Sequence, residues 1–140
     1  MLYVDTSVLV ALHVREPKSA GVSRWYAGCT DELVSAAWCV SEFASALGIK
    51  QRTGQIGEVD AQAAWRQFER MCAGDLYLLP VEPAIFHRAA ILSLDVVSGL
   101  RAGDALHLAA ALEAKAKGIA TLDEAMAKNA KRLKFKLAAF

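Results

Sequence analysis

The sequence has few of the features that staple small extracellular proteins together. Only 3 of its 140 residues are cysteine, an odd number, and no two of them form a Cys-x-x-Cys pair. This pattern supports neither a disulfide framework nor a zinc site, which needs closely spaced ligands. We therefore expect reduced thiols in a cytoplasmic protein; the three residues are Cys29, Cys39 and Cys72.

Long apolar runs are also missing. Runs such as Val8–Leu12 and Leu108–Leu112 are far shorter than the roughly 20 residues that a membrane span needs. The first apolar run, Leu2–Val4, is followed by an acid rather than preceded by a basic segment, so we expect neither membrane attachment nor a secretory signal. Disorder is excluded, because 55% of the residues are hydrophobic and only 22% are charged.

Apolar segments of two kinds alternate along the chain, and no repeat or linker interrupts them. Short buried runs predict strands at 2–4, 33–36, 76–81, 119–121 and 135–137. Helical spacing and stop signals predict helices at 7–13, 18–26, 37–50, 58–73, 83–94, 104–117 and 125–133. This alternation predicts one α/β domain over residues 1–140, with a mostly parallel sheet of four or five strands covered on both faces.

Two acids follow predicted strands directly. Asp5 comes after the first strand, and Asp123 comes two residues after Thr121, at the end of the fourth. In an open α/β sheet, sites form outside the carboxyl ends of the strands. We therefore expect both carboxylates at the same edge of the sheet.

Two further acids allow an ordinary and a functional interpretation. Asp104 stands at a predicted helix start, where an aspartate often only caps free N–H groups. Glu42 lies on an apolar helix, and no Lys or Arg stands three or four positions away to pair with it. It is either an ordinary exposed glutamate or a carboxylate that faces a partner or a metal.

If these four acids converge, their charges repel one another and raise their pKa values. A divalent cation removes that repulsion, and oxygen ligands favour Mg²⁺ or Mn²⁺. Such a site can activate a water for displacement at phosphorus, and a carboxylate outside the metal's coordination can act as general base. The acids therefore indicate a metal-dependent phosphodiesterase or phosphatase.

The whole chain resembles PIN-domain proteins, most closely the VapC-type toxin ribonucleases of toxin–antitoxin systems. Four segments carry the resemblance in the expected order; they are Leu2–Ser7, Val40–Leu47, Leu100–Ala109 and Thr121–Asp123. The resemblance implies a three-layer α/β/α sandwich. It also implies that the protein cleaves RNA as the toxin of such a pair.

The resemblance also implies a role for particular residues. Asp5, Asp104 and Asp123 would bind Mg²⁺ or Mn²⁺, and Glu42 would complete the acidic pocket. The adjacent Glu124 competes for the last position, but the spacing from Thr121 favours Asp123. Ser7 and Thr121 would support the acids.

The resemblance further implies partners. These are an RNA substrate, a cognate antitoxin, a second copy of the chain in a homodimer, and DNA only through the antitoxin.

Arg101, Lys131 and Arg132 are candidate contacts for RNA or antitoxin, although a basic helix face is often simply solvated. Trp38 is a candidate for base stacking and His107 for a hydrogen bond to a site carboxylate, although both residue types are more often structural.

Two other classes of protein compete with this interpretation. A receiver domain or a haloacid-dehalogenase-like phosphatase would require paired acids or Asp-x-Asp after the first strand, and this chain has Asp5-Thr6-Ser7. A catalytically silent PIN module that binds RNA or protein would be expected to lack one of the four acids.

Overall fold

The computed structural model describes all residues, 1–140, and contains one five-stranded sheet. The strands are β1 (Leu2–Val4), β2 (Leu33–Ala36), β3 (Leu76–Leu79), β4 (Gly118–Ala120) and β5 (Lys136–Leu137). Their spatial order is β3-β2-β1-β4-β5, and all four neighbouring pairs are parallel. The predicted parallel sheet is confirmed, with five strands.

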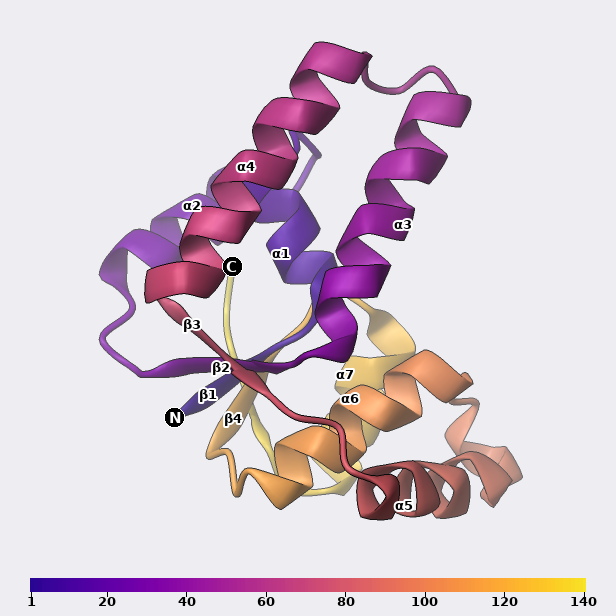
Figure 1. Ribbon diagram of the computed structural model, residues 1–140. Coiled ribbons are helices and arrows are strands. Elements are labelled where there is room, and N and C mark those ends of the chain that lie inside the picture. Colours follow the sequence, from indigo (N-terminus) through magenta and orange to yellow (C-terminus); the bar gives the residue numbers. More distant parts are fainter.

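Helices cover both faces of this sheet (Figure 1). The helices on one face are α1 (Thr6–His13), α2 (Ser19–Gly28), α3 (Trp38–Arg52) and α4 (Glu58–Gly74). The opposite face carries α5 (Pro83–Leu94), the short 3₁₀ helix η1 (Val96–Ser98), α6 (Ala102–Glu113) and α7 (Glu124–Arg132). The molecule is thus a three-layer α/β/α sandwich, as expected. No helix is both long and apolar enough to cross a membrane.

Side chains alternate across the sheet and build two separate cores. Val4 and Leu33 face the layer of α1 to α4, where Phe43 and Phe68 stack with ring centroids 4.1 Å apart. Tyr3 and its neighbours on β2 and β4 face the other layer, whose centre is α6. Residues 105–111 of α6 are all buried, which explains why this helix is apolar around its whole circumference.

The predicted end of α6 is wrong. The sequence predicts that Gly118 closes a helix ending at Lys117, but α6 ends at Glu113 and the chain reverses at Lys115, whose φ is 53°. Gly118 instead begins β4 because it meets its neighbours at close range. A Cβ at this position would lie 2.8 Å from the carbonyl oxygen of Lys136 and 2.9 Å from Leu2.

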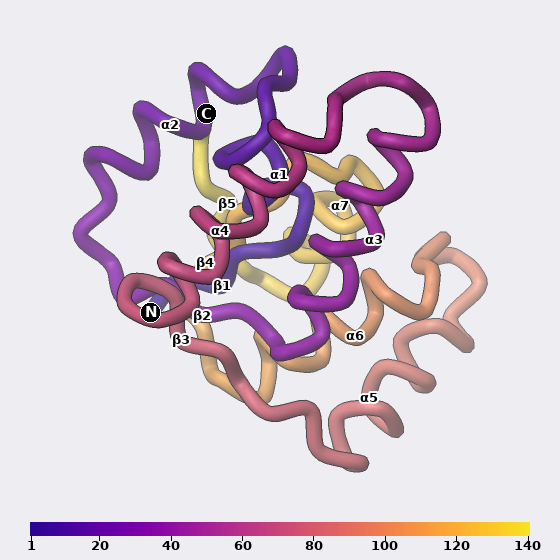
Figure 2. The backbone as a smooth tube through the Cα atoms, turned by 45° about the horizontal axis from the view of Figure 1, so that its top comes forward, coloured from indigo at the N-terminus to yellow at the C-terminus, as the bar shows by residue number.

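The strand order reverses next to β1. The chain moves outward from β1 through β2 to β3 and then returns to place β4 on the other side of β1. The carboxyl ends of β1 and β4 are therefore the switch point at which α/β sheets form their sites. The C-terminal segment runs back beside α2 (Figure 2). The ring of its last residue, Phe140, contacts the ring of Trp25 on α2.

Candidate active site

Asp5 lies at the switch point, between the end of β1 and the start of α1. It is the N-cap of α1, and its Oδ1 accepts hydrogen bonds from the backbone N–H groups of Ser7 (2.8 Å) and Val8 (3.3 Å). The Ser7 hydroxyl donates to the same oxygen at 2.5 Å, and the Thr121 hydroxyl donates to Oδ2. The two residues expected to support the acids therefore both contact Asp5, and Thr121 fastens the end of β4 to the end of β1.

Burial dominates the electrostatics of Asp5. The residue is only 4% exposed, and burial raises the pKa of its carboxyl above the ordinary value, although the Ser7 and Thr121 hydrogen bonds act in the opposite direction. No Lys or Arg forms an ion pair with it.

Asp123 lies at the end of the neighbouring strand and begins α7. Its Oδ1 caps the helix by accepting the Met126 N–H at 2.7 Å, and its own N–H donates to Thr121 Oγ1 at 3.0 Å. Its Oδ2 has no protein partner. The side chain is exposed, as is that of Glu124 in the first turn of α7.

Asp104 comes from the first turn of α6, but it is not the cap of that helix. The N-cap is Arg101, which makes no side-chain cap bond. Burial raises the pKa of Asp104, and the negative charges of Asp123 and Asp5 raise it further, against a backbone hydrogen bond with Arg101. Asp104 therefore lies close enough to Asp123 and Asp5, which come from distant parts of the sequence, for their charges to act on it.

Glu42 has a partner that its sequence neighbours do not reveal. His107 Nε2 lies 2.5 Å from Glu42 Oε2, and the Thr6 hydroxyl donates to the same oxygen at 2.5 Å. Burial alone would raise the pKa of Glu42, but His107, Thr6 and Trp38 together lower it below its ordinary value. The expected hydrogen bond from His107 to a site carboxylate is present, and His107 is also buried, at 3% exposure.

A glycine allows α6 to begin against this carboxylate. A Cβ on Gly103 would lie 2.9 Å from Glu42 Oε1 and 3.6 Å from the indole nitrogen of Trp38. Since Gly103 precedes Asp104 directly, the close approach places Glu42 beside the start of the helix that carries Asp104. In Figure 1 the first turns of α1, α3, α6 and α7 lie on the same side of the molecule.

The chemistry of these donors fits a hard divalent cation. All are carboxylate oxygens, Asp123 keeps one oxygen free of protein hydrogen bonds, and no Lys or Arg forms an ion pair with them. As arranged here, no three of the chain's His, Cys, Asp and Glu side chains are grouped closely enough to hold a metal.

Comparison with known proteins identifies the family of this fold. The family model of the PIN domain matches residues 2–132. The chain belongs to the PIN domain family. No curated protein matches it in sequence.

Solved structures of low sequence identity share the fold of this PIN domain. VapC20 of Mycobacterium tuberculosis, a toxin that cleaves the sarcin–ricin loop, aligns with a TM-score of 0.75 and 13% identity over 92% of this chain and 95% of its own. FitAcB from Neisseria gonorrhoeae aligns with a TM-score of 0.69 and 16% identity over 99% and 97%. VapBC2 from Rickettsia felis, bound to a DNA fragment from its promoter, gives 0.63 and 12% over 99% and 98%.

The candidate basic contacts of this PIN domain differ in their surroundings. Arg101 is exposed at the N-terminus of α6, three residues from Asp104, and Lys131 is exposed on α7 without an ion pair. Arg132 already donates to Asp95 and to Asn129, both at 3.1 Å. Arg101 and Lys131 are therefore the freer candidates for a phosphate.

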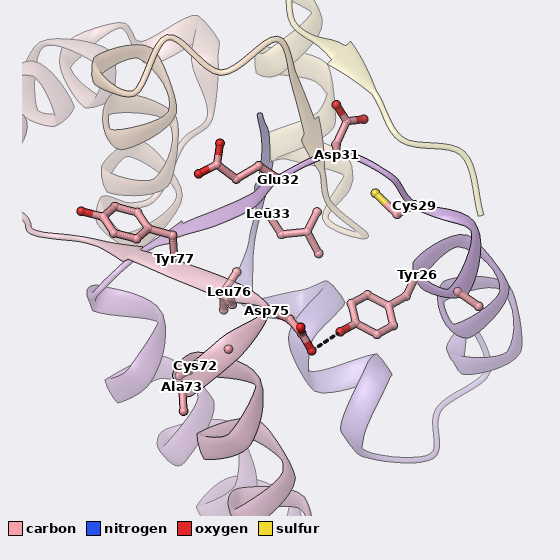
Figure 3. Close-up of a pocket in the computed structure, with 12 residues that line it drawn as sticks. Tyr26, Cys29, Asp31, Glu32, Leu33, Cys72, Ala73, Asp75, Leu76 and Tyr77 are labelled. Carbon is pink, nitrogen blue, oxygen red and sulfur yellow. Dashed lines mark hydrogen bonds between the residues drawn. The ribbon is translucent and has the colours of Figure 1, made fainter.

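A cavity of about 650 Å³ lies elsewhere in the PIN domain and contains none of the predicted site residues (Figure 3). It opens at the amino ends of β2 and β3, where Tyr26 donates a hydrogen bond to Asp75 at 3.0 Å. Asp31 and Glu32 also line it. Its place at the opposite edge of the sheet from Asp5 separates it from the candidate active site.

Proposed function

We propose that this PIN domain is a metal-dependent endoribonuclease that acts as the toxin of a toxin–antitoxin pair. The proposal is supported by the place of Asp5 and Asp123 at the ends of β1 and β4 and by the influence of both charges on Asp104, with no Lys or Arg ion-paired to any of the three. Asp5, Asp104 and Asp123 would hold Mg²⁺ or Mn²⁺. When bound, the ion supplies charge stabilisation at the scissile phosphate and lowers the pKa of a water.

The protein's own groups have distinct roles in this proposal. Ser7 and Thr121 hold the Asp5 carboxylate rigid, so that its orientation does not change between free and substrate-bound protein. Glu42, kept ionised by its lowered pKa, accepts a hydrogen bond from the attacking water through Oε1 and orients it. The exposed Arg101 guanidinium binds a neighbouring phosphate of the RNA.

The proposal extends to the partners of the protein. A hollow of about 360 Å³ beside Thr6 and Ser7 is lined by four apolar and five polar residues, with Ile49 and Leu122 among the apolar ones, and would receive a segment of a cognate antitoxin. The exposed apolar residues Ile91, Leu94, Val96 and Val97 on α5 and η1 support a homodimer. DNA would be bound only through the antitoxin, and an RNA-cleaving toxin would act in the cytoplasm.

The test is cleavage of total cellular RNA by the wild type and Asp5→Asn, each with Mg²⁺, Mn²⁺ or EDTA. We expect discrete fragments with a 5′-phosphate and a 3′-hydroxyl only for the wild type with metal. Asp5→Asn should lower the rate by about 100-fold or more. Equal cleavage by both proteins would refute the assignment of the site. An absence of cleavage in every sample, together with no metal binding by calorimetry, would favour a catalytically silent binding module.

A further inference from the structure

A chain of hydrogen bonds connects the centre of the sheet to the candidate active site. The Ala36 N–H donates to the Tyr3 hydroxyl oxygen at 3.0 Å, and this oxygen lies 2.7 Å from His107 Nδ1. His107 Nε2 in turn lies 2.5 Å from Glu42 Oε2, which also accepts the Thr6 hydroxyl. The chain joins β1, β2, α6 and α3, whose residues here are up to 104 positions apart.

The polarity of this chain assigns the proton on His107. The Tyr3 oxygen accepts the Ala36 N–H, which leaves its own proton free to donate to His107 Nδ1, 2.7 Å away. An imidazole that accepts at Nδ1 carries its proton on Nε2, which faces Glu42. The carboxylate thus receives two donors on Oε2, from His107 and from Thr6, and Oε1 is left facing the start of α6.

The chain of hydrogen bonds is buried at its Tyr3 end and partly exposed to solvent at its Glu42 end. Tyr3 is fully buried and the His107 side chain is 3% exposed, whereas the Glu42 side chain is 28% exposed. The buried part therefore holds a carboxylate that reaches solvent beside Asp104. The second ring nitrogen of His107 thus contacts an acid of the site that is partly exposed to solvent, and not another group of the core.

We propose that His107, itself oriented by Tyr3, is a positioning residue that fixes the Glu42 carboxylate for RNA cleavage. The inference rests on the proposed function. It adds two residues, His107 and Tyr3, to the four acids. In this arrangement His107 fixes one oxygen of Glu42 and leaves the other for the attacking water.

Two substitutions of His107 separate positioning from packing. The amide nitrogen of glutamine reaches the place of Nε2, and that of asparagine the place of Nδ1. His107→Gln should therefore keep most of the wild-type kcat, whereas His107→Asn should lower kcat roughly 10–100-fold with little change in KM. The matched control is His87→Asn, which replaces an exposed histidine of α5. Wild-type kcat in folded His107→Asn, or the same loss in both His107 variants, would overturn the inference.

A measurement without RNA detects the hydrogen bond between His107 and Glu42 directly, and in the wild type it does not depend on how well the His107 variants fold. In ¹⁵N-labelled wild type, we expect the His107 imidazole to carry a slowly exchanging Nε2 proton shifted far downfield, and Glu42→Gln to move that signal upfield. A proton on Nδ1 alone, or a signal that Glu42→Gln leaves unchanged, would overturn the inference. A wild type that cleaves no RNA would remove the proposed function, whereas wild-type cleavage with full activity in His107→Asn would remove only the role of His107.

Discussion

At the scale of single residues, the candidate site brings acidic side chains together without a Lys or Arg ion-paired to them. Asp5 is buried, and the pKa of Asp104 is raised by burial and then by the charges of Asp123 and Asp5. A carboxyl with a raised folded-state pKa stabilises the fold fully while it is protonated. This contribution is lost as the pH rises from the ordinary pKa of aspartate through the raised value.

Asp104→Asn should therefore stabilise the metal-free protein. In EDTA at neutral pH, we expect its free energy of unfolding in urea to exceed that of the wild type, and the difference to vanish at acidic pH where Asp104 is protonated. Added Mg²⁺ should stabilise the wild type more than the variant. Glu69→Gln, on the exposed face of α4, is the control. An Asp104→Asn protein no more stable than the wild type in EDTA would show that the acids do not repel one another.

Gly103→Ala offers a way to move Glu42 without removing any functional group. Its Cβ would displace Oε1 of a carboxylate whose other oxygen, Oε2, is held by His107 and Thr6, so we expect kcat to fall by up to about 100-fold. Thermal stability should hardly change, because alanine favours the first turn of a helix. Gly28→Ala, with open space around its Cβ, serves as the comparison. Unchanged cleavage by Gly103→Ala would mean that the position of Glu42 is not critical.

The sequence predicts the acids and some of their neighbours, such as Ser7, Thr121 and His107, but not the full set of contacts around Glu42. Asp5 and Asp123 follow strands, and the ends of parallel strands meet, so their convergence is predictable. The bond between His107 and Glu42 spans 65 positions and depends on how α6 packs against α3, which no local spacing encodes. Sequence reasoning misses Tyr3 and Thr6 for the same reason. The only available signals are a hydroxyl on the otherwise apolar strand β1 and another at the start of α1.

At the scale of secondary-structure elements, periodicity predicts every α-helix and strand, and close packing shifts their ends. Helix α6 stops before its lysines because the chain must turn at Lys115 to enter the centre of the sheet. There Gly118 lies between the carbonyl oxygen of Lys136 and the side chain of Leu2. The sequence position of this glycine indicates a helix stop, whereas close contact between strands is the physical reason for it.

Gly118→Ala tests this close contact. The added methyl group would meet a backbone oxygen that cannot move aside, so we expect a loss of about 1–3 kcal/mol in the free energy of unfolding. Cleavage per folded molecule should stay at the wild-type level, since β4 keeps its place next to β1. Gly74→Ala at the end of α4 has no such neighbour and should be close to neutral. Equal stability of both variants would contradict the packing account.

At the scale of the whole molecule, a nearly neutral chain separates its charges. With the four candidate acids set aside, 11 of its 15 acidic residues remain against 16 basic ones, so the surface outside the site is basic. The lysines of α7 and the segment after it are exposed and form no ion pairs; they are Lys128, Lys131, Lys134 and Lys136. Such a surface can attract RNA phosphates without regard to sequence.

Lys131→Ala should weaken RNA binding and reduce the slope of log affinity against log salt by about 1. Binding is measured in the Asp5→Asn background, so that the RNA stays intact. Arg132→Ala should change the slope less, because its guanidinium is bonded to Asp95 and Asn129. Arg88→Ala, which breaks an exposed pair with Glu113, is the control. A slope that Lys131→Ala leaves unchanged would assign this lysine to an ordinary solvated surface.

The central claim is that Asp5, Asp104 and Asp123 together bind the ion that cleavage requires. The most direct measurement is the anomalous scattering of crystals grown with Mn²⁺, combined with RNA cleavage by the same preparation. We predict a manganese peak coordinated by oxygens of these three aspartates, and cleavage that EDTA abolishes. RNA cleavage by a preparation whose crystals show no manganese at these carboxylates would contradict the account.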